Sequence, residues 1–154
     1  MDYQQSRAYI RDAEQYAGGA LDLTNIKEIM KRLGNPQDQL KYVHVAGTNG
    51  KGSVIAYLYT TLTNAGYHVG RYISPSVYSY REKIEVEGTP ISREQFAKHT
   101  TRVAAVIEEM TAEGLAHPTP FEIETAVAFL FFAEEKCDPV ILEVGMGGIT
   151  DATN

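Results

Sequence analysis

A glycine-rich segment of the sequence carries the residues best suited to chemistry. Glycines allow a tight turn whose backbone N–H groups converge on an anion, and the N-terminus of a following helix adds partial positive charge. Lys51 can then reach the β- and γ-phosphates of a nucleoside triphosphate, and the Ser53 hydroxyl stands where a magnesium ligand is usual. The segment therefore predicts an ATP site formed by Gly47, Thr48, Asn49, Gly50, Lys51, Gly52 and Ser53.

The spacing of this loop departs from the common pattern G-x-x-x-x-G-K-[ST]. Its first glycine, Gly47, stands three residues before Gly50, and Gly52 separates Lys51 from Ser53. A plain strand-to-helix turn with a solvated lysine is the alternative interpretation. The glycine density, the lysine, the hydroxyl and the expected strand–loop–helix context together favour nucleotide binding.

Glu143 and Ser74 are candidate metal ligands. Glu143 lies near the end of the apolar run 140–144, where a buried carboxylate is costly unless it is paired or bound to a metal. Ligands of open parallel sheets bind at the carboxyl ends of the strands, and Mg²⁺ prefers hard oxygen ligands. A solvated glutamate is the alternative for Glu143, and on its own Ser74 is an ordinary turn serine before Pro75.

The elements that must position these residues alternate between helices and short apolar strands. This order predicts an α/β domain with three layers and a mainly parallel sheet, of the phosphate-loop type. Two capping boxes, at Ser92 and Thr119, are expected to start helices. The expected helices cover 2–16, 24–33, 51–64, 92–111 and 119–136, and the expected strands cover 42–46, 68–73, 84–86 and 140–144.

Composition narrows the function classes. The chain has 154 residues, of which 44% are hydrophobic, and a formal net charge of −6, which argues against a general nucleic-acid binder because such proteins need a basic surface. Its apolar runs are too short for a membrane span, and a single cysteine, Cys137, forms no intrachain disulfide. We therefore expect a cytoplasmic protein without membrane or nucleic-acid partners.

Five motifs, in order, resemble those of the folylpolyglutamate synthases, which are members of the Mur ligase superfamily. The phosphate loop within 43–53 is the first, and its unusual spacing is a feature of that family. The remaining motifs are Leu33-Gly34-Asn35-Pro36, Tyr72-Ile73-Ser74-Pro75 with Arg81-Glu82-Lys83-Ile84, Phe121-Glu122 with Thr125, and Glu143-Val144-Gly145-Met146-Gly147-Gly148 with Asp151-Ala152-Thr153-Asn154. Two positions depart from the family: Lys83 replaces an arginine, and Ile149-Thr150 stands where many members have Arg-Leu.

The resemblance implies an ATP- and Mg²⁺-dependent ligase of folate and one-carbon metabolism. Such an enzyme phosphorylates the γ-carboxyl of a folate and joins the amine of L-glutamate to the acyl phosphate. It implies Lys51 and Glu143 as catalytic residues, Ser53, Ser74 and Glu143 as metal ligands, and Asn154 as a further ATP contact. Thr119, Phe121 and Arg81 are implied at the folate; the alternatives are a helix cap for Thr119 and a solvated loop for Arg81.

By the same resemblance, residues 1–154 form an incomplete ATP-binding domain. The rest of the sheet, a further metal ligand and a C-terminal glutamate-ligase domain would lie beyond Asn154. We therefore expect no ligation by this chain alone and self-association through an exposed sheet edge, whereas a full-length protein is expected to be a monomer. A bifunctional dihydrofolate synthase and a nucleotide-binding module without ligase activity are the alternative functions.

Overall fold

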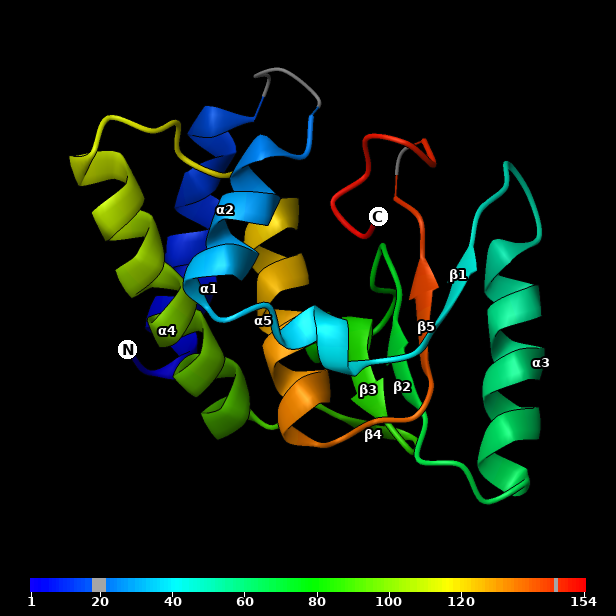
Figure 1. The fold of residues 1–154 in the computed structure, drawn as a ribbon. Helices are drawn as coiled ribbons and strands as arrows, with labels where there is room; N and C mark the ends of the chain where they lie inside the picture. Colours follow the sequence, from blue (N-terminus) through cyan, green and yellow to red (C-terminus); the bar gives the residue numbers. More distant parts are fainter. Residues whose placement is uncertain (18–21, 146) are drawn as a thin grey trace.

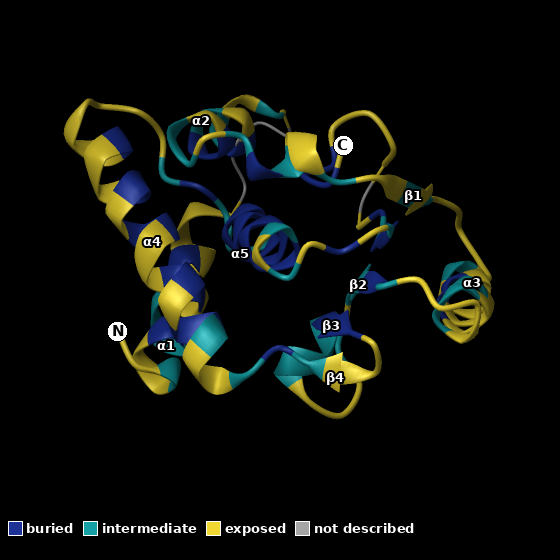
Figure 2. Ribbon diagram, turned by 60° about the horizontal axis from the view of Figure 1, so that its bottom comes forward, coloured by how far each residue is buried: buried dark blue, intermediate teal, exposed yellow. Residues whose placement is uncertain are grey.

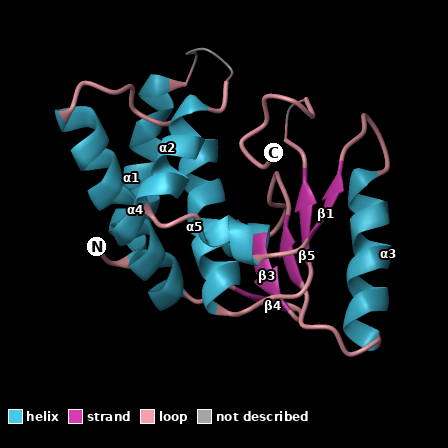
Figure 3. Ribbon diagram, in the orientation of Figure 1, coloured by secondary structure: helices cyan, strands magenta, loops and turns pink. Residues whose placement is uncertain are grey.

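The computed structural model describes residues 1–17, 22–145 and 147–154, and it has the expected layered α/β architecture (Figure 1). Helices α1, α2, α4 and α5 lie on one side of the sheet, and α3 covers the other side (Figure 3). The helices are α1 (Tyr3–Asp12), α2 (Thr24–Arg32), α3 (Lys51–Asn64), α4 (Arg93–Ala112) and α5 (Pro120–Glu134), with 3₁₀ helices η1 (Ala13–Tyr16), η2 (Pro36–Gln39) and η3 (Tyr80–Lys83). The helix expected over 2–16 therefore changes to 3₁₀ geometry in its last turn.

The sheet has the strand order β1-β5-β2-β3-β4. Its strands are β1 (Tyr42–Val45), β2 (Gly70–Tyr72), β3 (Ile84–Val86), β4 (Thr89–Pro90) and β5 (Val140–Glu143). Both β1 and β2 are parallel to β5, while β3 and β4 add antiparallel pairs at one edge. Because β5 lies between β1 and β2 and is parallel to both, the carboxyl ends of these three strands lie side by side at the same end of the sheet.

Local sequence signals explain where several helices begin. In a capping box, the side chain of the cap residue accepts a hydrogen bond from the backbone N–H of the third helical residue. The side chain of that third residue accepts a hydrogen bond from the backbone N–H of the cap residue. The helices α1, α4 and α5 each start with such a box. The boxes pair Asp2 with Gln5, Ser92 with Gln95, and Thr119 with Glu122.

The main core lies between the helices and the sheet. The α5 helix is buried nearly all round and occupies the centre of the molecule (Figure 2), as expected for a helix that is apolar on every face. Cys137 belongs to this core, and burial raises the pKa of its thiol to about 12, which agrees with a structural role. A smaller cluster under α3 contains Ile55, Tyr59, Val69 and Ile141. In the described part of the chain, no helix is long and apolar enough to cross a membrane.

Candidate functional site

The phosphate loop connects the end of β1 to the start of α3. Gly50 is the N-cap of α3, with φ of 80°, and Gly47 has φ of 152°; both values favour glycine over residues with a Cβ. No side chain caps α3, so its first-turn N–H groups remain available to an anion. Loop residues 46–50 are exposed to solvent. The structure therefore leaves the start of α3 open to solvent at the carboxyl end of β1, and anion binding there remains a prediction.

Lys51 lies between the loop and the end of β5. Its ammonium donates a hydrogen bond to the Gly47 carbonyl at 3.0 Å and lies 3.7 Å from Oε1 of Glu143. The other carboxylate oxygen of Glu143, Oε2, accepts a hydrogen bond from the Ser74 backbone N–H at 3.2 Å. Thus the structure brings together three of the residues that the sequence proposed, each from a different element.

This arrangement fits a magnesium ion held mainly by a nucleotide. The Glu143 side chain is only 12% exposed and already faces a cation, and Mg²⁺ is usually held by one or two carboxylates together with phosphates and waters. Ser53 lies in the first turn of α3, exposed to solvent. Among the described residues, no group of three or more His, Cys, Asp or Glu side chains forms a metal cluster, so protein ligands alone would provide an incomplete shell.

The segment after β5 folds back toward β1. Thr153 donates its backbone N–H to Oδ1 of Asp151 at 3.0 Å, and its hydroxyl lies 2.8 Å from Nε2 of His44. The Asn154 amide donates to the carbonyl of Ile149 at 3.1 Å, which stabilises the turn; contact with ATP remains a prediction. Ile149 itself is 82% exposed. Sequence reasoning assigned no role to His44, although its place in β1 puts it beside the last motif.

The start of α5 contains two of the three residues proposed for the folate, Thr119 and Phe121. The Thr119 hydroxyl donates to Oε2 of Glu122 at 2.9 Å and accepts from the Glu122 N–H at 3.3 Å, so the helix cap uses it fully. Phe121 stacks on Tyr72, with ring centroids 6.1 Å apart. A Cβ at Gly145 would lie 3.0 Å from the Phe121 ring and 3.0 Å from Asp151, which shows how closely the last motif approaches this ring.

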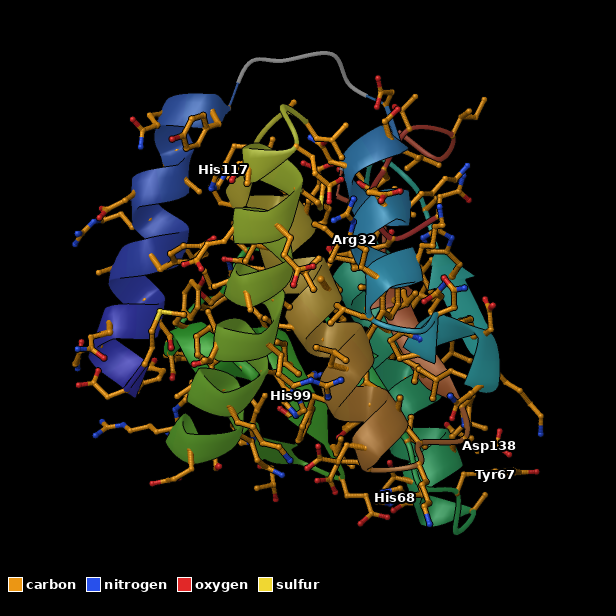
Figure 4. All side chains as sticks on the ribbon, turned by 60° about the vertical axis from the view of Figure 1, so that its left-hand side comes forward. Arg32, Tyr67, His68, His99, His117 and Asp138 are labelled. Carbon is orange, nitrogen blue, oxygen red and sulfur yellow. The ribbon has the colours of Figure 1, made fainter. Side chains whose placement is uncertain are left out.

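A cavity of about 810 Å³ lies beside the start of α5. Its lining includes Thr119, Glu122, Lys27, Tyr16 and His117. The rings of Tyr16 and His117 stack at 4.0 Å, and His117 lies near the ends of α1 and α4 (Figure 4). The volume is that of a small-molecule site, and the wall combines aromatic, cationic and hydroxyl groups.

Arg81 lies apart from this cavity lining. Its NH1 group donates to the carbonyl of Ile91 at 2.8 Å, and its side chain is half-buried. This bond fixes the segment after the loop 74–79 to the strand region. The structure therefore gives Arg81 a structural contact, and its contact with a carboxylate of a substrate remains a prediction.

Sequence reasoning missed the buried carboxylate of Glu124. Its carboxylate accepts from the Lys83 ammonium at 2.9 Å and 3.0 Å and from the Tyr80 hydroxyl. The Arg7 guanidinium stacks 3.3 Å from the centroid of the Tyr80 ring. A carboxylate within an apolar helix was the available signal, since the same rule identified Glu143.

Comparison with known proteins gives consistent relatives. Over 153 residues the chain is 42% identical to the dihydrofolate synthase/folylpolyglutamate synthase of Bacillus subtilis, covering 99% of this chain and 35% of that protein. Over 134 residues it is 35% identical to the dihydrofolate synthetase of Saccharomyces cerevisiae, covering 87% of this chain and 30% of that protein. The chain thus spans about a third of the length of these relatives. No protein-family model matches it.

Solved structures agree with this result. The folylpolyglutamate synthase of Thermotoga maritima superimposes with a TM-score of 0.89 at 38% identity, covering 98% of this chain and 35% of that one. A complex of a folylpolyglutamate synthase with AMPPCP and folate superimposes with a TM-score of 0.91 at 34% identity, covering 100% of this chain and 38% of that one. At these identities the likeness extends to sequence as well as fold.

Proposed function

Because this chain is homologous to the N-terminal part of the folylpolyglutamate synthases, we propose that it forms the nucleotide-binding part of an ATP-dependent ligase that joins L-glutamate to a folate. The observation that carries the proposal is the uncapped start of α3, with Lys51 and Glu143 beside it. This is a site for a triphosphate whose charge is met by backbone N–H groups, one ammonium and one metal-binding carboxylate. The relative solved with AMPPCP and folate supports it.

In this proposal the chain acts by placing the γ-phosphate and neutralising its charge. The N–H groups of 47–53 bind the phosphate oxygens, and Lys51 adds a positive charge where the bond to the leaving ADP breaks. Glu143, with Ser74 and Ser53, would hold Mg²⁺, which supplies further charge neutralisation when bound. The γ-carboxylate oxygen of the folate attacks the γ-phosphorus, so that an acyl phosphate forms and ADP leaves.

The second step makes the amide bond. The amine of glutamate attacks the acyl phosphate carbon, loses a proton and expels inorganic phosphate. Phosphorylation is needed because a free carboxylate is a poor electrophile at neutral pH. We place the folate at the start of α5, where Phe121 can stack on an aromatic ring and Thr119 lines the cavity, with Arg81 as a proposed partner for a carboxylate. The glutamate site would lie outside this chain.

A second candidate function uses the same chemistry on a different acceptor. Relatives of this chain are named dihydrofolate synthases as well as folylpolyglutamate synthases, and these act on dihydropteroate and on folates, respectively. A full-length protein carrying this sequence should be offered dihydropteroate and tetrahydrofolate separately, with labelled glutamate. Incorporation of glutamate with both acceptors would indicate a bifunctional enzyme. Incorporation with only one would show that the protein is specific for that acceptor.

For the 154-residue chain alone, we propose nucleotide binding without ligation. The chain should bind Mg²⁺–AMPPCP in isothermal titration calorimetry, Lys51→Ala should abolish the heat, and Lys41→Ala should not change it. Lys41 is a suitable control because it also pairs with a carboxylate, Asp138, at 2.9 Å, but precedes β1, whereas the loop follows β1. Unchanged binding by Lys51→Ala would reject the site, and glutamate ligation by the chain alone would reject its restriction to binding.

A further inference from the structure

Lys51 holds a place that a metal ion would also occupy, beside the Oε1 atom of Glu143. Oε2 of Glu143 is fixed by the Ser74 N–H at 3.2 Å, whereas Oε1 faces the Lys51 ammonium at 3.7 Å. The ammonium is kept there by its bond to the Gly47 carbonyl at 3.0 Å. The phosphate site and the metal site therefore share one cation from the protein.

We propose that Lys51 acts as an internal counter-ion that blocks metal binding at Glu143 until a nucleotide arrives. The inference rests on the proposed function, because the event that removes Lys51 from Glu143 is the binding of phosphate oxygens. A divalent cation at Oε1 would stand next to an ammonium, and like charges at such a distance repel strongly. When phosphate draws the ammonium away, that repulsion falls and Oε1 becomes free.

The shielding of the site makes this exchange effective. The side chains of Lys51 and Glu143 are 23% and 12% exposed, respectively, so water screens their interaction less than that of a surface pair. The Gly47 carbonyl that holds Lys51 belongs to the same loop whose N–H groups bind the phosphates. One ligand can thus reorganise the loop, release the lysine and expose the carboxylate.

The proposal sets an order of binding. A free divalent ion should bind this chain weakly, and a nucleotide should bind first or together with its metal. By thermodynamic linkage, the metal and the nucleotide must then strengthen each other's binding by the same factor. The coupling between metal and nucleotide binding should be stronger than direct contact between metal and phosphate alone would produce. The additional part comes from the removal of the Lys51 ammonium from Glu143.

The test is a titration of the chain with Mn²⁺ alone, followed by electron paramagnetic resonance of the free ion. Lys51→Met should bind Mn²⁺ more tightly than the unchanged chain by about tenfold, within the usual range for coupled ligands. Lys51→Arg, which keeps the positive charge, should stay as weak as the unchanged chain. Lys41→Met removes a lysine from another carboxylate, Asp138, and should show no such gain.

Adding Glu143→Gln to Lys51→Met should remove the gain and so locate it. Circular dichroism melts will show that each variant is folded. No gain in Lys51→Met, an equal gain in Lys51→Arg or Lys41→Met, or a gain that survives Glu143→Gln would each overturn the proposal. Since the titration contains no nucleotide, failure of the unchanged chain to bind AMPPCP would reject the proposed function separately.

Discussion

The two faces of the sheet differ in packing and in how their helices begin. On the α5 side, α1, α4 and α5 start with capping boxes and enclose a continuous core. On the α3 side, the helix starts at an uncapped glycine and covers a small cluster around Ile55. On the first face, α1, α4 and α5 are capped by side chains and α2 is not, whereas on the second face α3 starts uncapped directly after the glycine-rich loop. Stability is therefore expected mainly on the α5 face and nucleotide binding on the α3 face.

A matched pair of isoleucines tests the difference in packing and should give the largest effect. Ile107 in α4 and Ile55 in α3 are each 1% exposed, but they belong to the large and the small cluster, respectively. Truncation to alanine should cost about 4 kcal/mol for Ile107 and about 2 kcal/mol for Ile55, because a cavity in a small cluster collapses more easily. Urea unfolding followed by circular dichroism measures both, and equal costs would contradict the comparison.

The buried ion pair on the α5 face gives the next effect. Lys83 and Glu124 have side chains 16% and 8% exposed, respectively, and the pair joins η3 to α5. Lys83→Met should lower the free energy of unfolding by about 3 kcal/mol, because it leaves a buried carboxylate without its cation. Lys41→Met breaks an exposed pair that solvent screens, so its loss of stability should be far smaller than that of Lys83→Met. Similar losses in the two variants would show that Glu124 is solvated.

The pH dependence of stability should report whether water reaches the core on the α5 face, because His99 lies buried there. This ring is fully buried between α4 and α5 (Figure 4), and burial lowers its pKa from 6.5 to about 4, despite the opposing effect of Glu134. Lys98 and Arg102 lower it further. The folded state therefore binds the proton less well than the unfolded chain. The stability that this provides is complete above pH 6.5 and is lost as the pH falls toward 4.

Between pH 6.5 and 5, the free energy of unfolding should drop by about 2 kcal/mol through His99 alone. The His99→Leu variant removes the titrating group and should show a correspondingly smaller drop over the same range. Urea unfolding at each pH provides the measurement. Parallel profiles for the two chains would show that water reaches the ring.

Local signals allowed much of this fold to be predicted from sequence. The capping residues Ser92 and Thr119 and the glycines of the phosphate loop act within a few residues, so the bounds of α3, α4 and α5 were close to those expected. Lys51 and Glu143, which the structure places 3.7 Å apart, could also be proposed from sequence, because glycine spacing and a charged residue in an apolar strand are local patterns.

The remaining features depend on residues far apart in the chain. The insertion of β5 between β1 and β2 follows from packing of the whole sheet, and no local pattern specifies it. The contact of His44 with Thr153 spans 109 positions, and that of Lys83 with Glu124 spans 41. Such pairs are selected by the tertiary structure, which explains why sequence reasoning assigned no role to His44 and did not pair Glu124 with Lys83.

Substitutions at the first residues of the helices should have the smallest effect on stability, and they separate a role in stability from a role in nucleotide binding. Ser92→Ala removes the cap of α4 and should cost about 1 kcal/mol. Gly50→Ala should cost a similar amount, about 1 kcal/mol, because Gly50 has φ of 80° and a Cβ there would meet no atom within 4 Å, so only backbone strain remains. Urea unfolding should thus place the two variants close together.

Nucleotide binding should nevertheless distinguish them. Gly50→Ala disturbs the turn that directs the first N–H groups of α3, so calorimetry with Mg²⁺–AMPPCP should show affinity reduced at least about tenfold, the loss of roughly one hydrogen bond to a charged group. Ser92→Ala lies on the other face and should bind as the unchanged chain does. If both variants lost affinity in proportion to stability, the open helix end would have no special role, and the contrast between the two faces would be one of packing alone.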